Sequence, residues 1–255
     1  MKLPQLVLFM ILLVGSNQIA EAQLLKNQKQ FTRQDSLRGS ITPERAWWDL
    51  KYYDLDVTVK PADKFIFGSN EITYEVLEPY QVLQIDLQEP MKIVNATQNN
   101  RELEVKQEGN AHFIQLVDPQ IVGVTNRVKI TFEGTPREAK NAPWDGGFSW
   151  EKDNNGTPFI ATSNQGLGAS VWWPNKDHMY DEVESMLISV NVPGDLTDVS
   201  NGRLQSVKEL EDGTKTYNWY VSNPINNYGV NINIGDYVSF SEKYKGEKGN
   251  LDCTY

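Results

Sequence analysis

A glutamine between an extended segment and two glycines is the side chain of this sequence best suited to binding a polar ligand. Residues 158–162 (Pro-Phe-Ile-Ala-Thr) have the composition of a strand end, and residues 165–168 (Gln-Gly-Leu-Gly) follow closely. Because glycine permits conformations and close approaches that a side chain would block, this run can present the Gln165 amide on backbone lying close to another surface. An amide offers donors and an acceptor but no charge. The alternative is that Gln165 only caps a turn, and Trp172 and Trp173 are expected to be core residues.

Groups for acid–base or metal chemistry are sparse. The two histidines, His112 in an expected strand and His178 in an expected turn, lack the H-x-x-x-H spacing that brings two imidazoles onto one zinc ion. Carboxylates gather at 177–184, but a charged turn before a strand is usually solvated, and proximity in sequence does not define a glycosidase pair. There is no Gly-x-Ser-x-Gly elbow. The sequence therefore predicts no catalytic residue and no metal ligand in this chain.

The elements that must position Gln165 are short strands. Residues 53–59 alternate between apolar and polar side chains, and 65–77 return after a turn at 61–64. Further strands are expected at 82–87, 91–96, 102–105, 112–116, 127–132, 184–192, 204–210, 215–221 and 228–240. No window of helical length has a persuasive 3.6-residue apolar period. The sequence therefore predicts an all-β fold, an antiparallel β-sandwich or a saddle-shaped set of sheets.

The amino terminus has the features of a secretory signal peptide. Lys2 precedes an apolar run at 6–14 that is too short to span a bilayer, and a small-x-small sequence closes residues 1–22. Residues 23–45 are polar and are expected to be flexible, and residues 46–255 are expected to form one β domain. We expect a protein exported to a periplasm, a cell surface or the medium, with no membrane span once the signal is removed.

Composition narrows the possible partners. The chain of 255 residues has a formal net charge of -10, which argues against nucleic acid and anionic membrane surfaces because both would repel it. Cys253 is the only cysteine, so an exported domain of this size must rely on its apolar core rather than on disulfides.

Two elements of the sequence resemble a known family. Residues 162–165 (Thr-Ser-Asn-Gln) are similar to the Thr/Ser-Gln-x-Gln/Glu element of the N-terminal β domain of the M1 zinc aminopeptidases, the aminopeptidase N-like gluzincins. Residues 172–177 (Trp-Trp-Pro-Asn-Lys-Asp) resemble the aromatic or apolar pair and Pro/Tyr-x-x-Asp turn that follow at a fixed gap. The likeness covers most of residues 47–240. Ser163 departs from the pattern, since many members have glutamine there.

The resemblance implies a saddle-shaped β domain and a role for Gln165 in holding the free α-amino group of a peptide substrate. It also implies that the loop at 134–156 borders the active-site cleft. In the family, zinc is bound by a His-Glu-x-x-His helix and a further glutamate downstream, and a Gly-x-Met-Glu-Asn element binds the substrate amine. This chain contains neither the His-Glu-x-x-His nor the Gly-x-Met-Glu-Asn motif. The expected partners are peptides and a catalytic domain missing from this chain, which alone is expected to bind no zinc and to be inactive.

Two other interpretations stay open. Trp144 and Trp150 lie in a loop, and aromatic side chains in loops can stack on sugars, so the chain could be a non-catalytic exported β-sandwich that binds carbohydrate or protein. It could also be an enzyme-like scaffold that has lost its metal domain and works by interaction.

Overall fold

A computed structural model describes residues 30–254, so the expected signal peptide at 1–22 lies outside the described residues. The chain divides into two units, residues 1–36 and residues 37–255. In the described part of the first unit, Thr32 and Asp35 cap the start of helix α2 (Arg33–Gly39) reciprocally, since each side chain accepts the main-chain N–H of the other, at 3.2 and 2.8 Å. No helix in the described part of the chain is long and apolar enough to cross a membrane.

The second unit begins with ordered structure where the sequence suggested flexibility. Residues 23–45 were expected to be a flexible segment, whereas α2 and helix α3 (Pro43–Ala46) occupy much of its described part. Leu37 is 3% exposed and the Arg45 side chain is fully buried. The Arg45 guanidinium donates to the main-chain oxygens of Leu37 and Ser40 at 2.8 and 2.9 Å. The polar composition of residues 23–45 therefore did not indicate that the buried Arg45 side chain orders the segment between α2 and α3.

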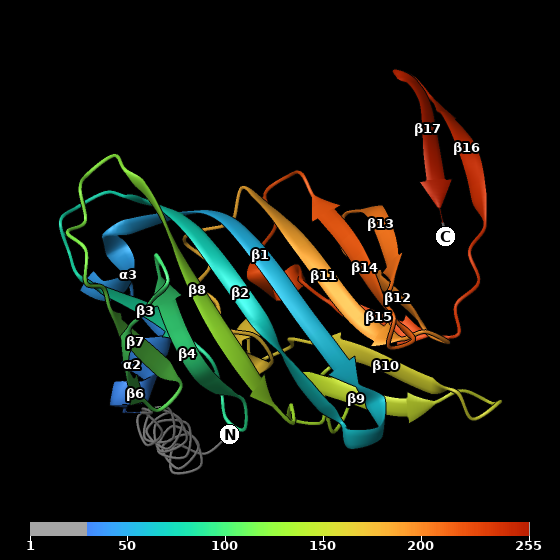
Figure 1. Cartoon of the computed structure of the whole chain (residues 1–255), viewed down its shortest axis with the longest axis horizontal. Coiled ribbons are helices and arrows are strands. Elements are labelled where there is room, and N and C mark those ends of the chain that lie inside the picture. Colours follow the sequence, from blue (N-terminus) through green and yellow to red (C-terminus); the bar gives the residue numbers. More distant parts are fainter. Residues whose placement is uncertain (1–29, 255) are drawn as a thin grey trace, which may run out of the picture. The chain divides into compact units, whose positions relative to one another are not determined.

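The largest element is an eight-stranded sheet with the order β13-β14-β11-β1-β2-β8-β4-β5 (Figure 1). Its strands are β1 (Trp48–Lys60), β2 (Phe65–Val76), β4 (Lys92–Gln98), β5 (Arg101–Glu102), β8 (Thr125–Gly134), β11 (Ser185–Pro193), β13 (Arg203–Glu209) and β14 (Thr214–Val221). The 3-10 turn η1 (Pro61–Asp63) joins β1 to β2. Six of the seven pairings are antiparallel, and the β1–β11 pair is parallel. The sheet is antiparallel, as the sequence predicts, except at this one pair.

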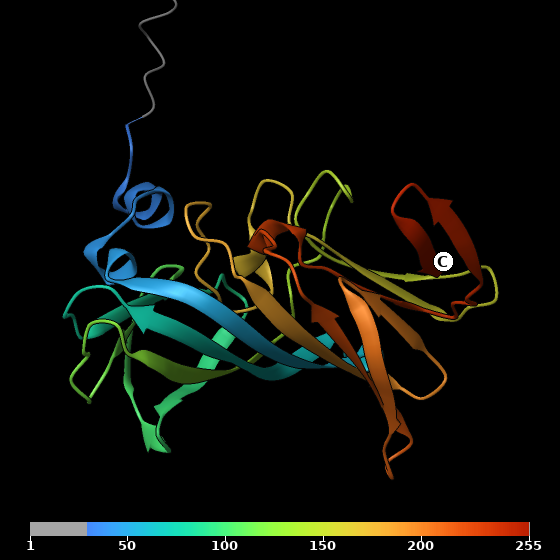
Figure 2. The ribbon, with the colours of Figure 1, turned by 90° about the horizontal axis from the view of Figure 1, so that it is seen from above.

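Three smaller sheets complete the described residues. A four-stranded sheet has the order β12-β15-β10-β9, and a three-stranded sheet has the order β3-β7-β6. The strands β16 and β17 form a hairpin, drawn in dark red beside the marked C terminus in Figure 2. Their strands are β3 (Val82–Asp86), β6 (Glu104–Glu108), β7 (Ala111–Gln115), β9 (Gly147–Lys152), β10 (Pro158–Ser163), β12 (Thr197–Ser200), β15 (Ile232–Gly235), β16 (Ser241–Gly246) and β17 (Gly249–Thr254). The strand expected at 228–240 is only β15, because the 3-10 turn η3 (Asn227–Gly229) precedes it. The all-β prediction is confirmed.

The core lies where alternation in the strands predicted it. Tyr53, Leu55, Val57 and Val59 on β1 are at most 2% exposed. They belong to one cluster with buried residues of the four-stranded and three-stranded sheets. Each buried aliphatic side chain of this kind contributes about 1.5–3 kcal/mol through the area it removes from water. Trp172 and Trp173 are fully buried in the same cluster, which confirms that this pair is core.

A buried ion pair lies next to this core. The Lys176 ammonium is 2.5 Å from Asp181 Oδ2 and donates to Trp48 O at 2.7 Å, and it lies 3.8 Å from the centre of the Trp48 ring. The lysine side chain is fully buried, and burial lowers its pKa while Asp181 opposes that shift. The ammonium is therefore charged only because its carboxylate, carbonyl and aromatic partners replace water.

We predict that Lys176→Met destabilises the protein by about 3–5 kcal/mol, because it leaves the buried Asp181 carboxylate without its cation. The double replacement Lys176→Met with Asp181→Leu should cost less than either single change. Lys92, whose 2.8 Å pair with Glu133 is exposed, is the control, and Lys92→Met should cost less than about 1 kcal/mol. Urea unfolding gives the free energy of unfolding of the parent protein, of the two single variants Lys176→Met and Asp181→Leu, of the double variant and of Lys92→Met. An equal loss of stability in Lys176→Met and Lys92→Met would contradict the prediction.

A second prediction concerns Asp198 on β12, which is fully buried and accepts a 2.8 Å hydrogen bond from the Trp219 indole. Burial raises the pKa of Asp198 to about 8, although the Trp219 bond acts in the opposite direction. Between about pH 4 and pH 8 the folded protein therefore keeps a proton that the unfolded chain has lost. Stability should fall as the pH rises through this window, by at most about 1.4 kcal/mol per pH unit from this group.

The variant Asp198→Asn cannot ionise and keeps the acceptor for Trp219, so it should lack this part of the pH dependence. The measurement is the free energy of unfolding of both proteins at pH 5, 6, 7 and 8. Parallel curves for the two proteins would mean that Asp198 does not titrate as expected.

Candidate functional site

Gln165 lies in a tight turn directly after β10. Asn164 O accepts hydrogen bonds from the main-chain N–H groups of Leu167 and Gly168, at 3.2 and 2.9 Å. Gly166 and Gly168 have φ values of 74° and 84°, in the region that glycine adopts without a steric penalty. The two glycines let the chain fold back here, and Gln165 is exposed.

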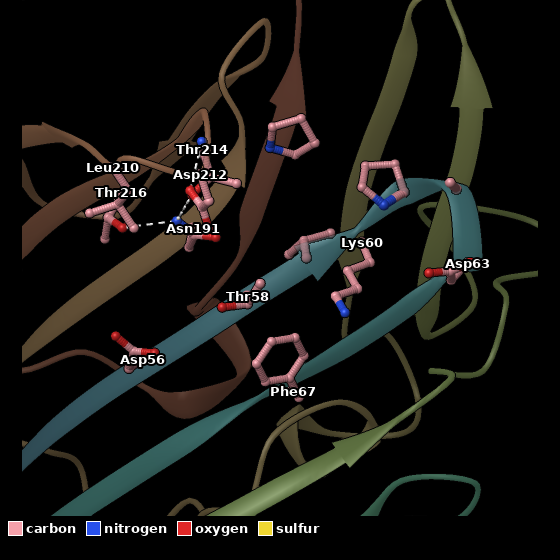
Figure 3. Close-up of a pocket in the computed structure, with 14 residues that line it drawn as sticks. Asp56, Thr58, Lys60, Asp63, Phe67, Asn191, Leu210, Asp212, Thr214 and Thr216 are labelled. Carbon is pink, nitrogen blue, oxygen red and sulfur yellow. Dashed lines mark hydrogen bonds between the residues drawn. The ribbon is translucent and has the colours of Figure 1, made fainter.

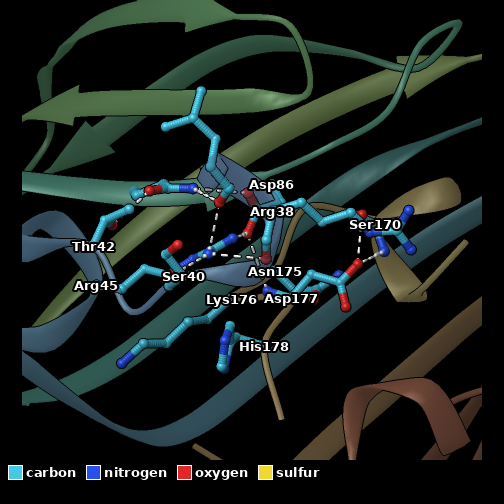
Figure 4. Close-up of polar contacts among 12 residues, drawn as sticks. Arg38, Ser40, Thr42, Arg45, Asp86, Ser170, Asn175, Lys176, Asp177 and His178 are labelled. Atoms are coloured by element: carbon cyan, nitrogen blue, oxygen red, sulfur yellow. Dashed lines mark hydrogen bonds and ion pairs between the residues drawn. The ribbon is translucent and has the colours of Figure 1, made fainter. Parts of the chain in front are cut away.

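Close backbone approach is also realised, at Gly168. A Cβ atom on this residue would lie 2.3 Å from Asp177 Oδ2. The same carboxylate oxygen accepts from the Ser170 main-chain N–H at 3.1 Å and from the Ser170 hydroxyl at 2.6 Å (Figure 4). Asp177 therefore orders the turn.

The opposite side of the turn is held by residues near η3. The Asn164 amide nitrogen donates to Tyr228 O at 2.9 Å and to Val230 O at 3.0 Å. The Tyr228 hydroxyl donates to Gln165 Oε1. The Gln165 side chain is thus exposed but hydrogen-bonded, and no feature of the sequence indicated Tyr228 as its neighbour.

Two further contacts tie outer segments to the turn. Arg38 on α2 donates to Gly166 O at 3.1 Å. The Ser163 hydroxyl donates to Pro143 O at 2.8 Å, which fixes the loop at 134–147 beside the end of β10. Many relatives have glutamine at this position. Here Ser163 binds the loop through Pro143 O and supplies no second amide.

That loop is itself braced by an ion pair. The Arg137 guanidinium donates to both Asp145 carboxylate oxygens at 3.0 Å, and this pairing lowers the pKa of Asp145. Trp144 is 74% exposed, whereas Trp150 stacks on Phe148 at 5.0 Å between ring centres and packs against the core. The two indoles of this region therefore do not form one exposed platform for a sugar.

Beneath the turn, the segment at 175–177 joins β3 through paired main-chain bonds. Asp86 N donates to Asn175 O at 2.9 Å, and Asn175 N donates to Asp86 O at 3.2 Å. The Asp86 carboxylate lies 2.5 Å from the Arg45 guanidinium and accepts the main-chain N–H of Asp177 at 3.2 Å (Figure 4). Burial raises the pKa of Asp86 to about 6, and Arg45 opposes the shift. The turn that carries Gln165 therefore lies on a buried polar framework.

The histidines are far from forming a metal centre. His112 on β7 is buried, and burial lowers its pKa. His178 Nε2 is 3.3 Å from Gly39 O, and its Nδ1 accepts from the Tyr180 N–H at 3.2 Å. Within residues 30–254, no group of three or more His, Cys, Asp or Glu side chains could hold a metal ion. The described residues therefore do not offer a ligand set for zinc.

A separate groove of about 640 Å³, which Gln165 does not line, lies over β1, β11 and β14. Figure 3 shows its polar side chains, among them Asn191, Thr214 and Thr216. Asn191 donates to the hydroxyls of Thr214 and Thr216 at 2.9 and 3.1 Å there. Because both amide donors of Asn191 are already used within the groove, this surface has fewer free groups to offer a ligand than its composition suggests.

The fold and this site define an all-β domain that presents one ordered, uncharged amide. Residues 50–228 match the family model of the Peptidase M1 N-terminal domain, so the chain belongs to that family. None of the curated proteins matches the chain.

Solved structures of M1 zinc metallopeptidases share the fold. The enzyme from Deinococcus radiodurans is 20% identical with a TM-score of 0.66, over 83% of this chain and 48% of that one. A mutant of the Deinococcus radiodurans enzyme bound to a Tyr-Ser-Ala substrate is 21% identical, with a TM-score of 0.67 over 82% of this chain and 47% of that one. A two-domain mutant bound to L-arginine has the same four values. The chain spans less than half the length of these structures.

The surroundings of Gly166 and Gly168 predict that replacement by alanine lowers the free energy of unfolding by different amounts at the two positions. Gly166→Ala should destabilise the protein by about 1 kcal/mol, because its positive φ is unfavourable for alanine and nothing lies within 4 Å of the added Cβ. Gly168→Ala should cost more than about 2 kcal/mol, because the added Cβ also displaces the Asp177 carboxylate from Ser170. Urea unfolding of both variants tests this order, and a Gly168→Ala protein as stable as Gly166→Ala would refute the close contact.

Proposed function

We propose that this chain is the N-terminal substrate-cleft domain of an exported, zinc-dependent aminopeptidase that removes amino-terminal residues from peptides. The observation that carries the proposal is the exposed Gln165 amide, held on a glycine turn at the end of β10 in a domain of the M1 family. Export is supported by the composition of residues 1–22.

The chemistry of the amide fits the amino terminus of a peptide. An α-ammonium group only donates hydrogen bonds, and it needs an oxygen acceptor within a cleft. Gln165 Oε1 has two lone pairs, of which the Tyr228 hydroxyl uses one. The second can accept from the ammonium group without adding a buried negative charge, whose desolvation costs several kcal/mol when its pairing is imperfect.

The ligands of the related structures support this substrate class. L-arginine and Tyr-Ser-Ala, bound by the two mutants described above, both carry a free α-amino group. Peptides with a free amino terminus are accordingly the proposed partners of this chain. The ordered loop at 134–147, tied to Ser163, is the proposed rim of the same cleft.

Zinc in this proposal is held by a catalytic domain outside this chain, and when bound it supplies an activated water for hydrolysis of the first peptide bond. This chain contributes binding and orientation, because Gln165 holds the amine and thereby sets the distance from the substrate's amino terminus to the reacting carbonyl. Isolated residues 1–255 are expected to be inactive.

In the full-length enzyme, Gln165→Ala should raise the KM for aminoacyl substrates by about tenfold, the size expected for one hydrogen bond to a charged group. Gln165→Glu keeps an acceptor and serves as the control, and its KM should rise less than that of Gln165→Ala. Steady-state kinetics with an L-aminoacyl 4-nitroanilide measure both. An unchanged KM in Gln165→Ala would refute the assignment.

A further inference from the structure

Tyr228 contacts the Gln165 turn at two points. Its hydroxyl donates to Gln165 Oε1, and its main-chain oxygen accepts from the Asn164 amide at 2.9 Å. Asn164 is only 5% exposed, whereas the Tyr228 side chain is 49% exposed. One tyrosine therefore holds both the base of the turn and the functional group at its tip.

The position of Tyr228 is in turn fixed by its two neighbours. Asn226 Oδ1 accepts the Tyr228 main-chain N–H at 2.9 Å and so caps η3. The buried Asn227 amide donates to Lys176 O at 2.7 Å and to Asn175 Oδ1 at 3.1 Å. Because Lys176 and Asn175 belong to the buried framework beneath the turn, the tyrosine ring is anchored to it although half of the ring is in solvent.

We propose that Tyr228 is a positioning residue, whose hydroxyl selects the rotamer and amide orientation in which Gln165 presents its oxygen to the substrate's ammonium group. This inference rests on the proposed function. A free glutamine side chain loses considerable rotamer freedom when it is ordered, and its terminal amide can turn either the oxygen or the NH2 group toward a ligand. The NH2 group cannot accept from an ammonium.

Tyr228 lowers both the entropy cost of ordering the Gln165 side chain and the cost of selecting its amide orientation, because it orders Gln165 before the substrate binds. Its hydroxyl hydrogen bond fixes the torsions of Gln165, so less entropy is lost on binding. As a donor, the hydroxyl also stabilises the orientation that places Oε1 between Tyr228 and the ligand. Tyr228 acts through Gln165 and need not touch the substrate.

The test uses the full-length enzyme and an L-aminoacyl 4-nitroanilide. Tyr228→Phe keeps the ring and removes the hydroxyl, and it should raise KM about fivefold while kcat changes less than about twofold. In the Gln165→Ala background, Tyr228→Phe should leave KM unchanged, because the group it positions is gone. Tyr220→Phe, which removes another partly exposed hydroxyl from β14, is the matched control and should match the parent enzyme.

A second background separates positioning from a structural role. In Gln165→Glu both carboxylate oxygens accept, so no amide orientation has to be selected, and the KM effect of Tyr228→Phe should shrink to less than about twofold. A purely structural role would give the same KM change in the Gln165, Glu and Ala backgrounds, and this outcome would overturn the proposal. An unchanged KM in Tyr228→Phe, with a raised KM in Gln165→Ala, would overturn this inference alone. If Gln165→Ala leaves KM unchanged, the proposed function fails first and this inference fails with it.

Discussion

One buried lysine, Lys176, connects the segment at 164–181 to the core of the domain. The Lys176 ammonium binds Asp181 and Trp48 O, its main-chain N–H donates to the Tyr53 hydroxyl, and its main-chain oxygen accepts from Asn227. These bonds connect the start of β1, the inner face of that strand and η3. A buried cation is costly unless it is paired and hydrogen-bonded, so the ammonium group depends on both Asp181 and Trp48 O. The turn that presents Gln165 is connected to Lys176 through η3, because Asn227 bonds to Lys176 O and the adjacent Tyr228 bonds to Gln165.

The site above it is assembled from three separate parts of the chain. The turn after β10 supplies the amide, η3 supplies Tyr228 and Asn227, and α2 supplies Arg38. None of these parts is a regular element long enough to hold a side chain rigidly by itself. Rigidity comes instead from side-chain amides that bond to main-chain oxygens, as Asn164 and Asn227 do. Such bonds need no charge, and in this turn they act together with the Asp177 carboxylate, which accepts from Ser170.

The sequence could predict what is encoded locally. Alternation in β1 predicted its buried face, the glycines indicated special backbone conformations and a close approach at 165–168, and the resemblance pointed to the family that residues 50–228 match. The parallel β1–β11 pairing could not be read from alternation, because a period of two describes the faces of a strand and not its neighbour. Tyr228 was missed as a partner of Gln165 because the two are 63 residues apart and meet through the packing of separate segments. The break before β15 depends on Asn226, whose side chain competes for the main-chain N–H of Tyr228.

The parallel pairing of β1 with β11 has a consequence for the order in which the protein folds. β1 pairs with β2 across η1, a connection of a few residues, whereas β11 reaches β1 only after most of the domain has been passed. Loop-closure entropy opposes the long connection far more than the short one, so the meander of β1, β2 and β8 has the local contacts needed to assemble first. One edge of β1 then stays unpaired, with its peptide groups open to other strands, until residues 185–193 arrive. Until β11 pairs with it, this edge of β1 can pair with a strand of another molecule.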